Sequence, residues 1–172
     1  MTGGQRKKIE ELLALLREDE KEIYREIAGY AVELGYLPSI TKNAHDVVID
    51  FAFSKAKIGR RLMKIGKPQG AAWNSGKAKL NMTFYAAEYS DFFQERVRRD
   101  FETVMGGKSC DGKCKDCHGK YTYVYPDGKR VFRCSLHSLI EISPIGAEHV
   151  AEIKKMMKMQ DDFWMDTIKS AD

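Results

Sequence analysis

Apolar residues in the first part of the chain recur at the spacing of helices. Over residues 5–17, and again from Glu18 to Leu34, they fall three or four positions apart, which places them on one face of each helix. Gly35 follows the second stripe and Pro38 comes soon after, as expected where a helix ends. The two stripes consist of Ile9, Leu12, Leu13 and Leu16, and of Ile23, Ile27, Tyr30, Ala31 and Leu34. The sequence therefore predicts two N-terminal helices.

The hydrophobic period then changes to two, which indicates strands. Apolar and polar residues alternate over residues 46–53 and 77–86, and two further candidate segments, 57–65 and 71–73, lie between them. Turn-forming sequences separate these segments at residues 66–70 and 74–76. This arrangement predicts an antiparallel β-meander of three or four strands.

The second half of the chain predicts two more helices. Asp91 and Gln94 have the spacing of a capping box, and the helix that follows would turn Phe93, Val97, Phe101 and Val104 inward. The last helix begins near Pro144, with an apolar stripe of Val150, Ile153, Met157, Phe163, Trp164 and Ile168. We therefore expect one α+β domain over residues 1–172, in which an antiparallel β-meander packs against N-terminal helices, a middle helix and a C-terminal helix. A zinc-knuckle β-hairpin is expected within it, over residues 110–142.

The hairpin is predicted from the cysteines. All four lie within 25 positions, with the spacing Cys110-x3-Cys114-x2-Cys117-x16-Cys134. Asp127–Gly128 between β-rich runs is typical of a two-residue hairpin turn, and pairing about it places Cys134 opposite Tyr121, close to Cys117. The hairpin would thus return the last cysteine to the other three, as a tetrahedral thiolate site for zinc requires. Four protein ligands leave no open position for water, so this zinc would be structural.

The fourth zinc ligand has two candidates. If the strand after Lys129 continues unbroken, alternation places Cys134 and His137 on opposite faces, and Cys110 completes the site. If the strand breaks after Cys134, the sequence Cys134-x-x-His137 forms a second knuckle and His137 replaces Cys110. The sequence leaves both arrangements open.

Other cysteine chemistries fit the spacing less well. Covalent haem attachment at C-x-x-C-H and the iron–sulfur spacing of radical-SAM enzymes each match part of the pattern. The first leaves Cys110 and Cys134 unexplained, and the second leaves too few residues after Cys117 for a barrel. A redox C-x-x-C pair belongs at a helix start, and disulfides are rare in a reducing cytosol.

Charge is unevenly distributed, although the net charge is only +4. Residues 51–87 carry eight basic side chains and no acidic one. Because such a segment attracts phosphate groups, an anionic-ligand surface is predicted from Lys55, Lys57, Arg60, Arg61, Lys64, Lys77 and Lys79. The competing interpretation is a solvated strand face whose lysines discourage aggregation, or one that an acidic helix over residues 10–26 neutralises.

These features favour a zinc-containing, non-enzymatic binding module for nucleic acid or a phosphorylated ligand. The alternative is a small-molecule-binding protein or enzyme with a pocket between sheet and helices. A shared, unneutralised cationic face would support the first class, and dispersed or ion-paired cations the second. The N-terminus has no apolar signal segment and no apolar run reaches 18 residues. We therefore expect a cytoplasmic protein without a membrane partner.

Overall fold

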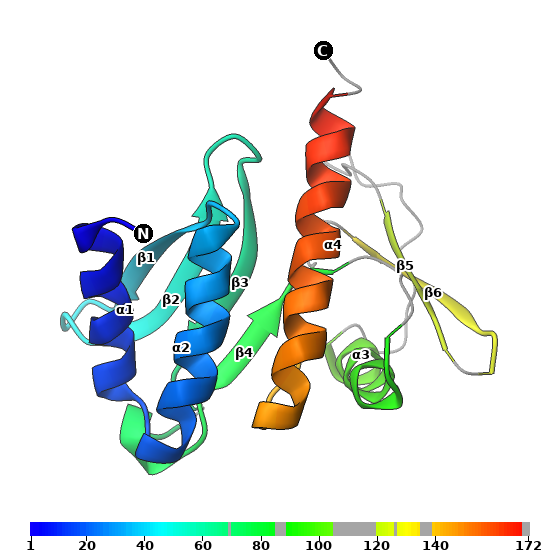
Figure 1. Ribbon diagram of the computed structural model, residues 1–172. Helices are drawn as coiled ribbons and strands as arrows, with labels where there is room; N and C mark the ends of the chain where they lie inside the picture. The colour runs from blue at the N-terminus through cyan, green and yellow to red at the C-terminus, as the bar shows by residue number, and fades with distance from the viewer. Residues whose placement is uncertain (69, 85–88, 105–119, 126, 135–138, 170–172) are drawn as a thin grey trace.

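The computed structural model describes residues 1–68, 70–84, 89–104, 120–125, 127–134 and 139–169. Within them, four α-helices and a five-stranded antiparallel sheet confirm the predicted α+β class (Figure 1). The sheet has the strand order β1-β2-β3-β4-β7, and β5 and β6 form a separate two-stranded sheet.

The two N-terminal helices form as the apolar stripes predict. They are α1 (Gly3–Leu15) and α2 (Glu18–Glu33), and Leu12 and Ile27 on their inner faces are fully buried. Gly35 ends α2 in the left-handed conformation, with φ +89°. Its N–H donates to the carbonyl of Val32, and the N–H of Tyr36 donates to the carbonyl of Ala31. This is the Schellman arrangement, in which glycine is favoured because it has no Cβ.

The predicted meander is confirmed in three strands, β2 (Val48–Lys55), β3 (Arg60–Gly66) and β4 (Lys79–Met82). The short segment 71–73 is not a strand; a 3₁₀ turn, η1 (Trp73–Ser75), occupies this region. An additional strand, β1 (Leu37–Lys42), was not predicted and pairs with β2 at the sheet edge. Strand β1 was missed because it contains Pro38. Proline is tolerated in edge strands, but it argues against a strand in the middle of a sheet.

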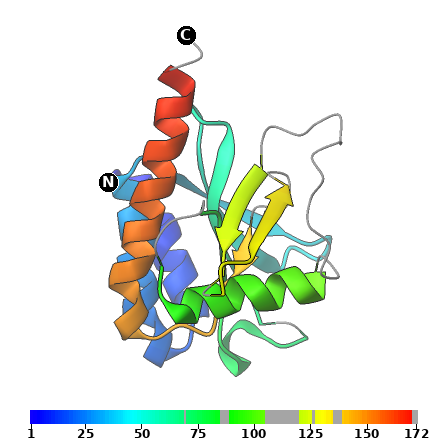
Figure 2. The same ribbon diagram turned by 90° about the vertical axis from the view of Figure 1, so that its right-hand side faces the viewer.

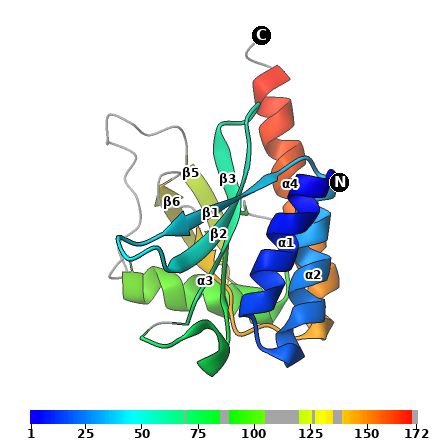
Figure 3. The same ribbon diagram turned by 90° about the vertical axis from the view of Figure 1, so that its left-hand side faces the viewer.

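Side-chain alternation gives the sheet one apolar and one polar face. Phe51, Phe53, Ile65 and Leu80 are buried in one core with residues of the helices. Helices α1, α2 and α4 lie together on one side of the strands (Figures 1 and 3). The other face carries the intervening, mostly polar residues, which form the candidate site described below.

The middle helix, α3 (Asp91–Val104), has the predicted inward positions, with Phe93, Val97 and Phe101 buried. It begins at Asp91 itself, and the Gln94 N–H donates to the Ser90 carbonyl. Asp91 is therefore the first helical residue rather than the cap. Helix α3 packs against β7 (Ile140–Glu141) and runs across the molecule below the β5–β6 hairpin (Figure 2).

The last helix, α4 (Val150–Lys169), follows a 3₁₀ turn, η3 (Ala147–His149). Ile153, Met157 and Trp164 are buried as predicted. Phe163, however, is 44% exposed, and the inward positions before Trp164 belong to the polar residues Gln160 and Asp161. The apolar stripe alone therefore misplaced one turn of this helix.

The hairpin joins β5 (Lys120–Val124) to β6 (Arg130–Cys134) in a register one residue away from the prediction. Cys134 lies opposite Lys120, not Tyr121. The cause is the turn, because Tyr125 pairs with Lys129 around a three-residue loop and Gly128 adopts φ +79°. A left-handed glycine is typical of such three-residue hairpins.

Strands β6 and β7 belong to different sheets. Residues 135–138, which connect them, lie outside the described residues, so the choice between Cys110 and His137 as the fourth ligand stays a prediction. Cys110, Cys114, Cys117 and His137 lie outside the described residues, and for Cys134 the backbone alone is described. The predicted zinc-knuckle hairpin is thus seen only as its two strands.

Candidate functional site

Three of the seven predicted surface cations are engaged in ion pairs with carboxylates from elsewhere in the chain. Lys55 pairs with Asp161, at 2.9 Å from Nζ to Oδ1. Lys64 pairs with Asp50 at 2.8 Å and Lys79 with Glu141 at 2.9 Å. All three lysine side chains are at least half-buried. These three lysines therefore do not contribute free charge to the predicted surface, which depends on the other four cations.

The remaining four cations make no ion pair with any residue that the structure describes. Lys57, Arg60 and Arg61 lie together at the β2–β3 turn, which closes through the Gly59 N–H and the Lys55 carbonyl. Lys57 and Arg61 are exposed and Arg60 is half-buried. Lys77 lies apart from this turn, near α2, where its charge acts on the Glu20 carboxyl. The predicted surface is therefore divided rather than continuous.

Glu20 is the member of the acidic helix that reaches this region. It is buried, and its carboxylate accepts the Ala78 backbone N–H at 3.1 Å. Burial raises the pKa of Glu20, while the hydrogen bond from Ala78 and the charge of Lys77 oppose that rise. The other carboxylates that neutralise the basic segment, Asp50, Glu141 and Asp161, come from outside this helix.

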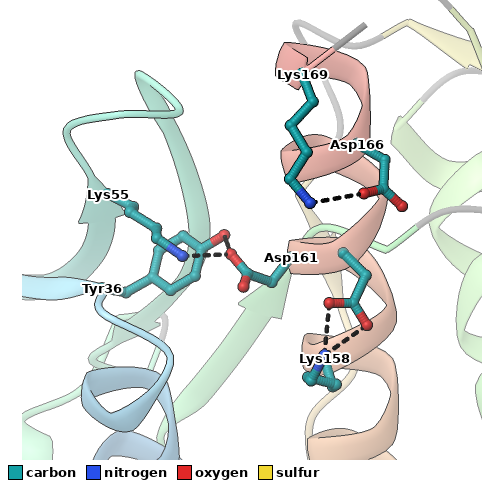
Figure 4. Close-up of polar contacts among 7 residues, drawn as sticks. Tyr36, Lys55, Lys158, Asp161, Asp166 and Lys169 are labelled. Carbon is teal, nitrogen blue, oxygen red and sulfur yellow. Dashed lines mark hydrogen bonds and ion pairs between the residues drawn. The ribbon is translucent and has the colours of Figure 1, made fainter.

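Asp161 connects helix α4 to the edge of the sheet (Figure 4). Its Oδ1 accepts hydrogen bonds from the Tyr36 hydroxyl and from Lys55 Nζ, both at 2.9 Å. Lys55 Nζ also lies 5.3 Å from the centre of the Tyr36 ring. Tyr36 is fully buried and Asp161 nearly so, whereas the neighbouring pairs Lys158–Asp162 and Lys169–Asp166 are exposed. This buried cluster therefore joins α4 to the end of β2 and to the residue that precedes β1, and it has a structural role.

The second cluster lies on the polar face of the sheet and spans four strands. Asp50 on β2 is opposite Gly66 on β3, which is opposite Lys79 on β4. In the next row, Lys64 on β3 is opposite Asn81, which is opposite Glu141 on β7. The pairs Asp50–Lys64 and Lys79–Glu141 each link one row to the other. Two lysines on the central strands β3 and β4 thus lie between a carboxylate on β2 and a carboxylate on β7.

Helix α3 supplies two arginines beside this polar face. Arg99 Nη2 donates to the Ser143 carbonyl at 3.3 Å, two residues beyond Glu141. Burial lowers the pKa of Arg96, the charge of Arg99 lowers it further, and the charge of Glu141 raises it. Arg96 therefore lies within electrostatic reach of both groups.

Neither protein-family models, curated proteins nor solved structures gave a match to this chain. The site is therefore interpreted from its own residues. In the part of the chain that the structure describes, no group of three or more histidine, cysteine, aspartate or glutamate side chains is placed to hold a metal ion. Among the described helices, none combines the length and apolar composition that a membrane crossing needs.

The sequence had singled out the lysines of this face but not their partners. Asp50, Glu141 and Asp161 were not among the predicted site residues. A signal for Asp50 was present, because the period-two pattern places it on the polar side of a strand next to the one carrying Lys64. For Glu141 and Asp161 no comparable signal exists, since they follow Lys79 and Lys55 by 62 and 106 positions.

Proposed function

We propose that this chain is a non-enzymatic binding module that contacts the phosphate backbone of nucleic acid through its β2–β3 turn. Lys57, Arg60 and Arg61 support the proposal, because they lie within five positions at the β2–β3 turn and pair with no carboxylate among the described residues. The turn projects at one end of the sheet (Figure 1). Contacts of this kind neutralise phosphates and release counterions without reading the base sequence.

Such binding would be weak and steeply dependent on salt. Each phosphate neutralised on duplex DNA contributes roughly 0.9 to the slope of log affinity against log salt. Three cations would therefore give a slope of up to about −3. Lys55 adds nothing to this slope, because Asp161 already balances its charge.

The test is a fluorescence-anisotropy titration of a labelled DNA duplex over a salt series. Arg60→Ala/Arg61→Ala should weaken binding and reduce the salt slope by up to about 2. Lys21→Ala/Arg25→Ala is the matched control, because it removes two positive charges from α2, where each cation already pairs with a glutamate. Equal effects of the two double variants, or no binding by the wild type at low salt, would contradict the proposal. If the protein binds phosphorylated small molecules but not DNA, the turn would be assigned to that class of ligand instead.

We further propose a structural zinc site formed by Cys110, Cys114, Cys117 and Cys134. The hairpin register supports it, since Lys120 pairs with Cys134 and only three positions separate Cys117 from Lys120. Thiolates and zinc meet only in the folded chain, so the metal would contribute folding free energy directly.

Elemental analysis of protein purified without chelator should give one zinc per chain. Cys110→Ser should release the metal, whereas His137→Ala should retain it. The opposite result would replace Cys110 by His137 as the fourth ligand, and iron or no metal in the wild type would contradict the zinc proposal altogether.

A further inference from the structure

A pocket lies between the N-terminal end of α1 and the start of β1. Figures 1 and 3 show this part of the molecule toward the same end of the sheet as the β2–β3 turn. The volume of the pocket is about 380 Å³, within the range of pockets that hold small organic molecules. Its lining consists of Thr2, Gly4, Gln5, Lys8, Leu37 and Pro38. The pocket is therefore large enough for a single flat ring system such as a nucleobase.

The strand register connects this pocket with the cationic turn. Leu37 on β1 is opposite Ser54 on β2, and Ser54 is opposite Arg61 on β3. Side chains that are directly opposite in antiparallel strands lie on the same face of the sheet, and two strand spacings amount to roughly 10 Å. Ser54, which lies between the other two, has a small, half-buried side chain. A ligand that contacts Arg61 can therefore reach Leu37 across this face.

The pocket offers both an apolar contact and hydrogen-bond donors. Leu37 is 51% exposed, so much of its apolar side chain is uncovered. Gln5 Oε1 accepts the Thr2 N–H at 2.6 Å, and the amide nitrogen of Gln5 has no partner among the described residues, which leaves two donors. The helix end itself is already capped, because the Gln5 N–H donates to the Thr2 hydroxyl. A nucleobase, which has flat apolar faces and acceptor atoms along its edge, matches both features.

Lys8 supplies a cation at the outer edge of the sheet. Its Nζ donates to the Pro38 carbonyl at 3.0 Å, and it makes no ion pair with a carboxylate that the structure describes. Arg61 is exposed on the other side of Leu37, two strands away. The exposed apolar side chain of Leu37 therefore lies between two cations that can each contact a phosphate.

We propose that this surface binds single-stranded nucleic acid, with one unstacked base in the pocket against Leu37 and the flanking phosphates on Arg61 and Lys8. This inference rests on the proposed contact between the β2–β3 turn and phosphates, and it adds the form of the nucleic acid. The bases of a duplex are paired and stacked, so one must be extruded before a pocket can take it. The unstacked bases of a single strand can enter directly. The protein should therefore bind a single strand more tightly than a duplex.

The experiment is a fluorescence-anisotropy titration of the full chain against a labelled DNA strand of mixed sequence and against the same strand annealed to its complement. At equal salt, the single strand should bind at least about fivefold more tightly. Leu37→Ser should weaken single-strand binding at least about fivefold, because the base loses its apolar contact, and should leave duplex binding unchanged. Val47→Ser is the matched control and should change neither affinity, since Val47 is 47% exposed at the opposite end of the β1–β2 hairpin.

Lys8→Met tests the second phosphate contact. It should reduce the salt slope of single-strand binding by about 0.7, and circular dichroism checks that the variant keeps its fold. Equal affinities for strand and duplex, an unchanged single-strand affinity in Leu37→Ser, or an unchanged salt slope in Lys8→Met would overturn this inference and leave the contact at the β2–β3 turn standing. No binding of either nucleic acid by the wild type at low salt would contradict both.

Discussion

Removing the carboxylate of Asp161 should destabilise the fold more than any exposed charge substitution on the same helix. In Asp161→Ala, the Tyr36 hydroxyl and the Lys55 ammonium both lose their acceptor. Breaking a buried ion pair by removing one partner costs about 3–5 kcal/mol. The side chain of Lys55 is 19% exposed and can regain part of its hydration, so we expect a loss of about 3 kcal/mol in the free energy of unfolding. For a chain of this size, this corresponds to a decrease of roughly 6–12 °C in the thermal midpoint.

Urea denaturation followed by circular dichroism measures this loss, and Asp162→Ala is its matched control. The control makes the same substitution one position later in α4, at a carboxylate that is 54% exposed and pairs with the exposed Lys158. Surface pairs contribute at most about 1 kcal/mol, so the two variants should differ by about 2 kcal/mol. A double-mutant cycle with Lys55→Met should give a coupling of at least about 1 kcal/mol. Equal stabilities of Asp161→Ala and Asp162→Ala would refute the assignment of Asp161 as the link between α4 and the sheet.

Two further predictions concern pH and metal. The pKa of Glu20 is raised above its ordinary value of 4.5, so the folded state holds this proton more tightly than the unfolded state, and the stability due to Glu20 falls as pH rises above about 4.5. Glu20→Gln should therefore remove this fall. Unfolding curves collected between about pH 4 and 7 should show that the stability of the variant, relative to the wild type, increases as pH rises. A difference that stays constant over this range would contradict the prediction. Chelation of the proposed zinc should lower the thermal midpoint by several degrees or more, and Cys110→Ser should show no further decrease with chelator.

The helices could be predicted because their signal is local. The stripes of α1, α2 and α3 come from residues three or four positions apart. In α2, Ile27 and Ala31 are buried as predicted, whereas Ile23, Tyr30 and Leu34 are partly buried and Tyr24, Ala28 and Val32 take the other inward positions. The misplaced turn of α4 has a different origin. Asp161 is inward because Tyr36 and Lys55 supply its hydrogen bonds, and these residues precede it by more than 100 positions. No pattern within the helix distinguishes Asp161 from the exposed Asp162.

The sheet was less predictable because strand pairing depends on turns and edges. Val48–Lys55 and Arg60–Gly66 were found by alternation, whereas β1 contains a proline and has apolar residues that are partly exposed. In the hairpin, Asp127–Gly128 correctly indicated a turn. A glycine can however be the last residue of either a two-residue or a three-residue loop, and the two loops pair the strands in different registers. The three-residue loop moved the partner of Cys134 by one position. A single backbone conformation, that of Gly128, decides this register.

The lysines of the basic segment show why charge along a sequence does not describe charge on a surface. Residues 51–87 contain no carboxylate, yet three of their lysines pair with carboxylates that the fold brings from β2, β7 and α4. Two of those pairs lie on the polar face of the sheet, where Gly66 separates an unpartnered Asp50 oxygen from Lys79. The same segment therefore carries two different charge environments, a cationic turn at its tip and a nearly balanced polar face at its centre.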